Sequence, residues 1–170
     1  MNLLASRKIK IAFYKEWKGL NHWVNAVIAG WTWLPNINTP PYSHVEIGFE
    51  FEDGWWFYSS TMRDGANGTR WISEKELLRN RERWDVYETE QEDRSVVDMI
   101  GLANLLLGRK YDKLGLAGFA TPFGLVNSKE NWYCSEVCWY ILTGKWKKRI
   151  SPRRMYKLVR KLCGIKLLGS

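Results

Sequence analysis

Two different spacings of hydrophobic and polar residues occur along the chain, and they predict strands and helices in mixed order. Alternation with a period of two residues predicts strands at 8–14, 45–51, 55–60 and 84–88. Apolar residues three and four positions apart predict helices at 20–31, 96–107, 133–142 and 152–162. Such a mixture favours an α+β fold with a mostly antiparallel sheet.

A hairpin at Asp53-Gly54 is the clearest local prediction. In the strand before it, Val45, Ile47, Phe49 and Phe51 point to one face, and His44, Glu46, Gly48 and Glu50 point to the other. Asp-Gly is a typical two-residue hairpin turn, so residues 55–60 should return antiparallel. Pairing Glu52 with Trp55 across this turn places Ser60 opposite Ile47.

Several residues with known capping preferences mark where the helices begin and end. Ser73 starts a capping box with Glu76, and Ser151-Pro152 has the chemistry of a helix start. Gly108 and Gly144 are suited to end the helices before them. Residues 62–69 are rich in glycine and are expected to form a loop that borders a site.

In two of these helices the apolar spacing also predicts which side chains point inward. In the helix at 96–107 these are Val96, Val97, Ile100, Ala103 and Leu107. In the last helix they are Met155, Leu158, Val159 and Leu162, and its basic residues point outward.

Cys134 is the first candidate for chemistry, because it falls in the first turn of the helix at 133–142. Amide N–H groups at a helix start favour the thiolate over the thiol, and they can also hold an oxyanion. The alternative is that Cys134 is a small buried hydrophobic residue, which is common for a cysteine on an apolar helix. A nearby base is needed to decide between the two.

His44 and Glu46 supply a candidate base and a group to orient it. They lie two residues apart on one strand face, within about 7 Å at a rise of about 3.3 Å per residue. A thiolate, an imidazole and a polar group that orients the imidazole are what a cysteine hydrolase requires. The sequence therefore predicts Cys134, His44 and Glu46 as catalytic residues.

Zinc binding is the chemical alternative, because Cys134 and Cys138 share one helical face and the chain has two histidines. The spacing between these cysteines does not match a Cys-x-x-Cys unit, and no second pair exists. We therefore expect no metal and no cofactor. Cys138 is interpreted as a core residue, Cys163 as incidental, and His22 as a surface residue.

Composition and charge indicate one domain with a basic end. The 170 residues are 45% hydrophobic, which is enough for one core, so a single domain at 1–170 is expected. From Lys145 to the end of the sequence there are ten Lys and Arg residues and no Asp or Glu. The net charge of the whole chain is +8, so the positive charge is concentrated in this segment. This basic helix, at about 145–170, is either a solvated face or a weak site for a polyanion or an anionic membrane.

Cysteine number and the first residues favour a reducing compartment. Three cysteines do not suggest a disulfide framework, and Met1–Leu4 leads into charged residues without a signal-peptide core. We therefore expect a cytoplasmic protein without a signal peptide. No apolar run is long enough for a transmembrane segment.

Five segments in a fixed order resemble circularly permuted NlpC/P60 papain-like proteins, the YiiX-like group, and above all its small phage members. These segments are Tyr42–Ile47, Ser59-Ser60, Arg63–Gly65, Gly108–Asp112 and Trp132–Glu136. Ile11–Lys15 and Trp31-Thr32 fit as well, so the similarity spans nearly the whole chain. Histidine precedes cysteine in that family, as it does here. Two departures are the longer stretch after Gly65 and Lys113 in place of an aromatic residue.

The resemblance implies a papain-like fold in which the sheet packs against the helix that carries the cysteine. It implies Cys134 as nucleophile, His44 as base and Glu46 as third residue. Tyr42, Ser60, Asp64 and Tyr133 lie in or beside the shared segments and are the candidate substrate-binding residues. A phage-encoded protein would act in the host cytoplasm.

Three functions stay open at this point. The first is a cysteine hydrolase or acyltransferase that acts on an amide, with a peptide or cell-wall peptide as leading substrate. The second is an acyl hydrolase or transferase that acts on a lipid ester or amide at a membrane surface. The third is a non-enzymatic phage accessory protein that uses the same scaffold for binding. The oligomeric state is not predicted.

Overall fold

The computed structural model describes residues 8–15, 40, 42–62, 65–90, 95–111, 132–147, 150–163 and 166–168. This part of the chain is α+β, with one six-stranded sheet in the order β4-β3-β2-β1-β5-β6 and antiparallel neighbours throughout. The strands are β1 Lys8–Tyr14, β2 His44–Phe51, β3 Gly54–Thr61, β4 Gly68–Ser73, β5 Trp84–Glu90 and β6 Lys166–Leu168. The helices are α2 Glu74–Leu77, the 3₁₀ helix η2 Leu78–Arg83, α3 Val96–Leu105, α5 Cys134–Thr143 and α6 Pro152–Cys163.

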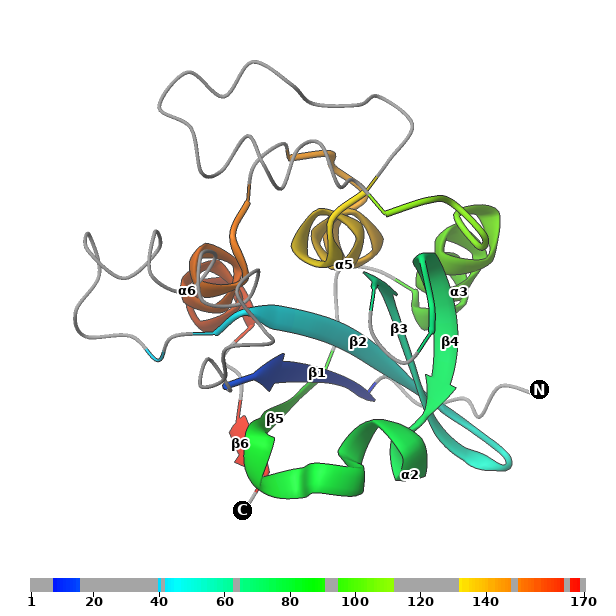
Figure 1. The fold of residues 1–170 in the computed structure, drawn as a ribbon. Helices are drawn as coiled ribbons and strands as arrows, with labels where there is room; N and C mark the ends of the chain where they lie inside the picture. The colour runs from blue at the N-terminus through cyan, green and yellow to red at the C-terminus, as the bar shows by residue number, and fades with distance from the viewer. Residues whose placement is uncertain are drawn as a thin grey trace.

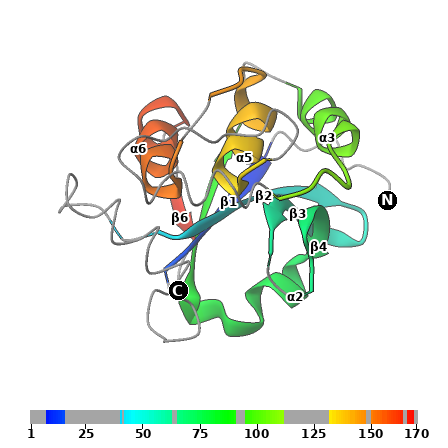
Figure 2. The same cartoon turned by 45° about the horizontal axis from the view of Figure 1, so that its top comes forward.

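The helices lie on both faces of the sheet. In Figures 1 and 2, α3, α5 and α6 are on one side, and α2 is on the other. Helix α5 is the middle one of the three, and it packs against β2 and β3. This arrangement places the start of α5 beside the strand that begins with His44.

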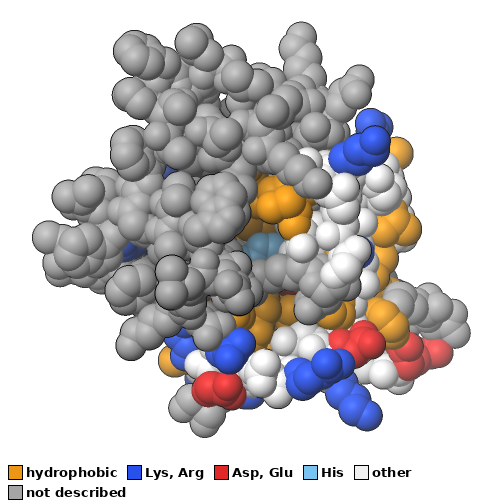
Figure 3. Space-filling view, in the orientation of Figure 1, with side chains coloured by type: hydrophobic (Ala, Val, Ile, Leu, Met, Phe, Trp, Pro, Cys, Tyr) orange, Lys and Arg blue, Asp and Glu red, His pale blue; other side chains and the backbone are white. Residues whose placement is uncertain are grey.

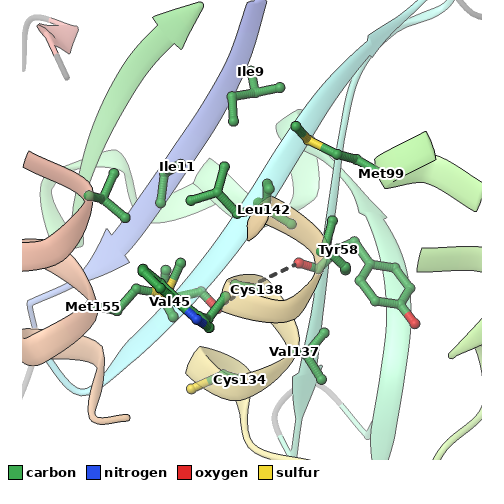
Figure 4. Packing of buried hydrophobic residues seen from close by; sticks show 14 of the residues in the cluster. Ile9, Ile11, Val45, Tyr58, Met99, Cys134, Val137, Cys138, Leu142 and Met155 are labelled. Atoms are coloured by element: carbon green, nitrogen blue, oxygen red, sulfur yellow. Dashed lines mark hydrogen bonds between the residues drawn. The ribbon is translucent and has the colours of Figure 1, made fainter. Parts of the chain in front are cut away.

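The main core lies between the sheet and α3, α5 and α6. Odd-numbered residues of β1 and β2 fill it, because successive side chains of a strand alternate between faces. Val137, Cys138 and Leu142 approach them from α5, and Met155 approaches them from α6 (Figure 4). Ile141 of α5 and Val159 of α6 belong to the same core. The predicted inward face of β2, Val45 to Phe51, is therefore confirmed.

A smaller core lies on the opposite face of the sheet. It contains Ala12, Tyr14, Phe57, Leu77, Trp84 and Val86. Ala12 pairs with Glu46 and Tyr14 with His44 across β1 and β2. The polar face of β2 thus looks toward the side of α2 and η2.

The hairpin after β2 is confirmed, but the predicted pairing is shifted by two residues along β3. Phe51 pairs with Gly54, so the two turn residues are Glu52 and Asp53. Gly54 has a φ of 116°, which glycine adopts without a Cβ clash. As a result Ile47 lies opposite Tyr58, where the sequence placed Ser60.

The predicted helix boundaries agree closely with the structure. Helix α5 spans Cys134–Thr143, and Gly144, which caps its end, is left-handed with a φ of 68°. The Ser73 hydroxyl accepts a hydrogen bond from the Glu76 N–H at 3.3 Å, and the Ser151 hydroxyl accepts one from Arg154 at 3.2 Å. Local side-chain chemistry was sufficient for these boundaries. The predicted helix at 20–31 lies outside the described residues.

Four details correct the sequence analysis. Strand β4 begins at Gly68, within the stretch expected to be a loop, and β6 was not expected. In α3 the buried residues are Val96, Met99 and Ala103, whereas Val97 is 61% exposed. Most residues of this segment are apolar, so their spacing is compatible with two different buried faces of the helix. Arg153 of α6 is fully buried, although the basic residues of that helix were all expected to point outward.

The described helices include none that is long and apolar enough to span a lipid bilayer.

Candidate active site

Cys134 is the first residue of α5 and is 4% exposed. Tyr133 before it is extended, and its N–H donates to the Glu136 carboxylate at 3.4 Å, which fixes the path of the chain into the helix. Backbone hydrogen bonds from Val45 and Ser135 reach the cysteine sulfur. Donors of this kind favour a thiolate over a thiol.

His44 is the first residue of β2, and its imidazole contacts the side chains of Glu46 and Cys134. Its Nε2 donates to Glu46 Oε1 at 3.1 Å. Because Nε2 is engaged in this way, Nδ1 is the nitrogen left for the hydrogen bond between His44 and the Cys134 side chain. Trp84 lies edge-on to the imidazole with its ring centroid 6.2 Å away, which restricts the ring's orientation.

Glu46 is fully buried and makes a two-pronged ion pair with Arg70 of β4. Arg70 Nη2 lies 2.9 Å from Oε1, and Nη1 lies 3.0 Å from Oε2. Burial works against the carboxylate's charge, but the Arg70 guanidinium and the His44 bond together lower the pKa of Glu46 to about 2. Glu46 is therefore an anion at any physiological pH.

The charges of Cys134 and His44 stabilise each other. Burial alone would lower the pKa of His44 and raise that of Cys134. The attraction and hydrogen bond between the two side chains outweigh burial, so the pKa of His44 is raised and that of Cys134 is lowered. This arrangement favours an imidazolium–thiolate pair.

Cys138, one turn further along α5, has the opposite character. It is fully buried, and burial, followed by the nearby Cys134 and Glu46 charges, raises the pKa of its thiol well above the usual value. Its sulfur lies 3.6 Å from the Val45 carbonyl and 3.8 Å from that of Tyr58 (Figure 4). The interpretation of Cys138 as a core residue is confirmed.

The candidate substrate-binding residues are placed in different surroundings. Tyr42 is fully buried, and its hydroxyl donates to Asp85 Oδ2 at 2.7 Å, so this geometry gives no support to a role in substrate binding. Ser60 is also buried, and its hydroxyl has no hydrogen-bond partner in the described part of the chain. The ring of Tyr133 packs edge-on against Tyr111 at 5.9 Å. Asp64 lies outside the described residues.

Arg70 is the site residue that sequence reasoning missed. It lies on β4 opposite Ser59 of β3, and its side chain reaches across to Glu46 on β2. The available signal was a single arginine in the alternating segment Gly68–Ser73, since a partly buried guanidinium needs an anionic partner. The glycine-rich start of this segment favours a loop, and a loop has no strand partner across which an ion pair could be predicted.

Figure 3 shows the surface of the molecule in the orientation of Figure 1. The colour of histidine reaches the surface next to hydrophobic side chains. His44 itself is 4% exposed, so only a small part of the ring is open. Within the described ranges, no three His, Cys, Asp or Glu residues form a group that could hold a metal ion.

Comparison with known proteins shows a relationship in fold. The chain is similar to the crystal structure of the metalloprotein YiiX from Escherichia coli O157:H7, described as DUF1105, with a TM-score of 0.50 and 14% identity. The match covers 93% of this chain and 83% of that one. At this identity the similarity concerns the fold, which is YiiX-like. No family model and no curated protein sequence matches the chain.

Proposed function

We propose that this protein is a thiol acyl-transfer enzyme of the permuted papain-like kind, in which Cys134 is the nucleophile. The observation that carries the proposal is the position of His44, which contacts the Cys134 side chain on one side and the Glu46 carboxylate on the other. A buried imidazole between a thiol and a carboxylate is the arrangement that activates a cysteine.

In the first half of the reaction the Cys134 thiolate attacks the carbonyl carbon of an amide. A sulfur–carbon bond forms, and the carbonyl oxygen becomes negative beside the N–H groups at the start of α5. His44 then gives its proton to the leaving nitrogen as the carbon–nitrogen bond breaks. Glu46 holds the ring in place and stabilises its positive charge until the proton leaves.

In the second half a water molecule attacks the thioester carbonyl. His44, now neutral, takes a proton from the water, and the carbon–sulfur bond breaks to restore the thiolate and the imidazolium. The products are a carboxylic acid and an amine. An acceptor other than water would make the same site an acyltransferase.

The donor groups of this chain do not fit a resident metal at the proposed site, although YiiX is described as a metalloprotein. Both oxygens of Glu46 are taken by the Arg70 guanidinium, and a cation there would meet a positive charge. Cys134 and His44 are then the donors that remain in the described site, fewer than the three protein ligands of a catalytic zinc site. No step is assigned to a metal.

A peptide-like amide, with a cell-wall peptide as leading candidate, is the proposed substrate. Its support is the resemblance to permuted NlpC/P60 proteins through the segments around His44 and Cys134. The fold itself does not choose between amides and esters, because substrate preference depends on the walls of the site.

Thiol reactivity tests this proposal without a known substrate. Brief, limiting iodoacetamide at neutral pH should alkylate Cys134 before Cys138, as located by mass spectrometry of the protein and its peptides. His44→Ala should slow labelling of Cys134 at least about tenfold, because the imidazolium that favours the thiolate is lost. Cys134→Ser serves as the control for the labelled position.

Two results would contradict the proposal. One is equal labelling of Cys134 and Cys138, which would mean that neither thiol is activated. The other is a His44→Ala variant that is folded by circular dichroism and reacts at the rate of the unmodified protein. A protein that uses this scaffold only for binding has no need of an acidic thiol.

A further inference from the structure

Helix α3 has a second apolar face, which is exposed to solvent. Val97 and Leu105 lie eight residues apart, on the side of the helix away from the buried Met99 and Ala103. Leu105 is 71% exposed, and Leu107, just beyond the helix, is 52% exposed. One exposed leucine needs no explanation, but several on one face are typical of an interaction surface.

Two basic residues follow the exposed leucines. Arg109 and Lys110 are exposed, and neither side chain has an ion pair or a hydrogen bond among the described residues. Gly108, with a φ of 80°, turns the chain between the leucines and these two residues. We call Leu105, Leu107, Arg109 and Lys110 the leucine tip. It therefore joins an exposed apolar surface to two unpaired positive charges.

The charges of this region are separated along α3. Asp98 lies in the first turn, about 10 Å from Leu105 along the axis at a rise of about 1.5 Å per residue. In the orientation shared by Figures 1 and 3, hydrophobic side chains lie on the surface over α3, with Lys or Arg side chains beside them. Apolar side chains beside cations match an anionic lipid bilayer, whose acyl chains lie beneath a layer of negative head groups.

The leucine tip lies next to the segment that leads into α5. The Trp132 N–H donates to the Lys110 carbonyl at 3.2 Å, and Tyr111 forms a parallel bridge with Trp132. Trp132 is only two residues before Cys134. A surface that holds the leucine tip would therefore lie near the candidate active site.

We propose that the leucine tip docks this protein on an anionic lipid bilayer. Leu105 and Leu107 enter the outer part of the bilayer, and Arg109 and Lys110 contact its anionic head groups. Docking needs no acyl-transfer chemistry. Its consequence, that a substrate held at the membrane surface reaches Cys134, rests on the proposed function.

Co-sedimentation of the full chain with lipid vesicles tests the docking. One set of vesicles is phosphatidylcholine alone, and the other contains about one third phosphatidylglycerol, both at about 0.15 M salt. The protein should bind the anionic vesicles at least about tenfold more tightly than the neutral ones.

The leucines are tested by replacement with a polar residue of smaller size. Leu105→Ser combined with Leu107→Ser should weaken binding to anionic vesicles at least about tenfold, because less apolar surface enters the bilayer. Leu167→Ser is the control, since Leu167 is 50% exposed on β6, at the edge of the sheet away from β4. It should change the affinity less than about twofold.

The basic residues are tested in the same way. Arg109→Gln combined with Lys110→Gln should weaken binding to anionic vesicles at least about tenfold. Lys75→Gln combined with Arg79→Gln removes the same charge from exposed residues of α2 and η2. This control should weaken binding less than about threefold, because it leaves the leucine tip intact. If the leucine variant does not fold by circular dichroism, the two charge variants carry the test.

Four results would overturn the inference. The first is no binding to anionic vesicles, and the second is an equal loss in a variant and its control. The third is full binding by the folded leucine variant, which would assign the binding to charge alone, as is expected of α6. The fourth is a dimer without lipid that the leucine variant abolishes, which would make this face a contact between two copies.

Cys134 alkylation, measured without lipid, separates this inference from the proposed function. The leucine-tip variants should react at the rate of the unmodified protein, and Cys134→Ser should bind vesicles as the unmodified protein does. Loss of vesicle binding with unchanged alkylation is the result expected if both are correct. Vesicle binding that needs the leucines, together with equal labelling of Cys134 and Cys138, would support the docking and contradict the proposed function.

Discussion

Glu46 contacts the Arg70 guanidinium and the His44 ring, and its negative charge favours the protonated form of that ring. Arg70 keeps the carboxylate ionised, with a pKa of about 2, although the group is fully buried. An ionised Glu46 in turn favours the imidazolium of His44, which favours the thiolate of Cys134. The influence of Arg70 on the sulfur therefore passes through two other side chains.

Arg70→Gln tests this chain of charges. Without the guanidinium the pKa of Glu46 rises, so a larger fraction is protonated in mild acid and no longer supports the imidazolium. The plot of the Cys134 alkylation rate against pH should keep its shape. Its low-pH limb should shift to higher pH by about one unit or more. Arg70→Lys restores the charge without the paired donors and should lie between Arg70→Gln and the unmodified protein.

Arg154→Gln is the control for that experiment, because Arg154 is exposed on α6 and carries the same charge. Its pH profile should match that of the unmodified protein. If both Arg70 variants also keep the original low-pH limb while folded, Arg70 does not position the site through Glu46.

Glu46 and Ser60 are the two candidates for the third catalytic residue. Glu46 Oε1 lies 3.1 Å from Nε2 of His44, whereas the Ser60 hydroxyl has no hydrogen-bond partner among the described residues. Glu46→Gln removes the anion that orients the ring and should lower turnover at least about tenfold, about 1.4 kcal/mol of barrier. Ser60→Ala should have a smaller effect. Both rates require a cleavable amide identified by screening.

The opposite ranking, with full activity in a folded Glu46→Gln and a loss in Ser60→Ala, would show that the third residue is misassigned. The alkylation profile gives a second measurement for Glu46→Gln. The Glu46→Gln substitution should slow labelling of Cys134 near neutral pH, because the imidazolium loses its anionic neighbour.

At the scale of elements, the loop after α3 is tied to the start of β4. The Thr69 N–H donates to the Arg109 carbonyl at 2.8 Å, and the Gly108 N–H reaches the Thr69 carbonyl at 3.4 Å. Gly68 has a φ of 144°, and a Cβ there would overlap the Arg109 carbonyl. This junction holds β4, and with it Arg70, in place.

Gly68→Ala should therefore be more destabilising than Gly65→Ala. Gly65 also has a positive φ, 77°, but a Cβ at that position would meet nothing within 4 Å. The backbone strain common to both changes is about 1–2 kcal/mol, and the clash at Gly68 should add at least about 1 kcal/mol. Urea unfolding of the two variants measures the difference. Equal free energies of unfolding would mean that the loop moves away from β4 without cost.

For the molecule as a whole, the packing of the basic C-terminal segment limits how this segment could bind a partner. The apolar side of α6 faces the core through Met155 and Val159, so it is not available to insert into a membrane. Arg153 is buried as well, and burial lowers its pKa. The exposed basic residues of α6 are Arg154, Lys157, Arg160 and Lys161. We therefore expect any binding of a polyanion or an anionic membrane by these residues to be electrostatic.

Affinity for DNA or for anionic vesicles should fall steeply as salt rises, because exposed charges are screened over about 10 Å at 0.1 M. Neutralising Arg154, Lys157 and Lys161 with glutamine should weaken this binding and leave Cys134 alkylation unchanged. Binding that persists at high salt would point to a specific pocket. Absence of binding at low salt would identify the segment as a solvated face.

The sequence alone determined the features that depend on neighbours along the chain. Alternation placed His44 and Glu46 on one face of a strand, and apolar spacing placed Cys134 at the start of a helix that ends at Gly144. Serine caps marked the starts of two further helices. These features are local, because a strand face, a helix stripe and a cap involve residues within a few positions of one another.

Only the tertiary structure decided which distant groups meet. The hairpin register depended on one residue of turn geometry, and Arg70 reaches Glu46 because β4 lies beside β3 and β3 beside β2. The buried position of Arg153 likewise depends on how whole elements pack. Periodicity tells which face of an element is buried, but it carries no information about its partner, because many pairings bury the same face equally well.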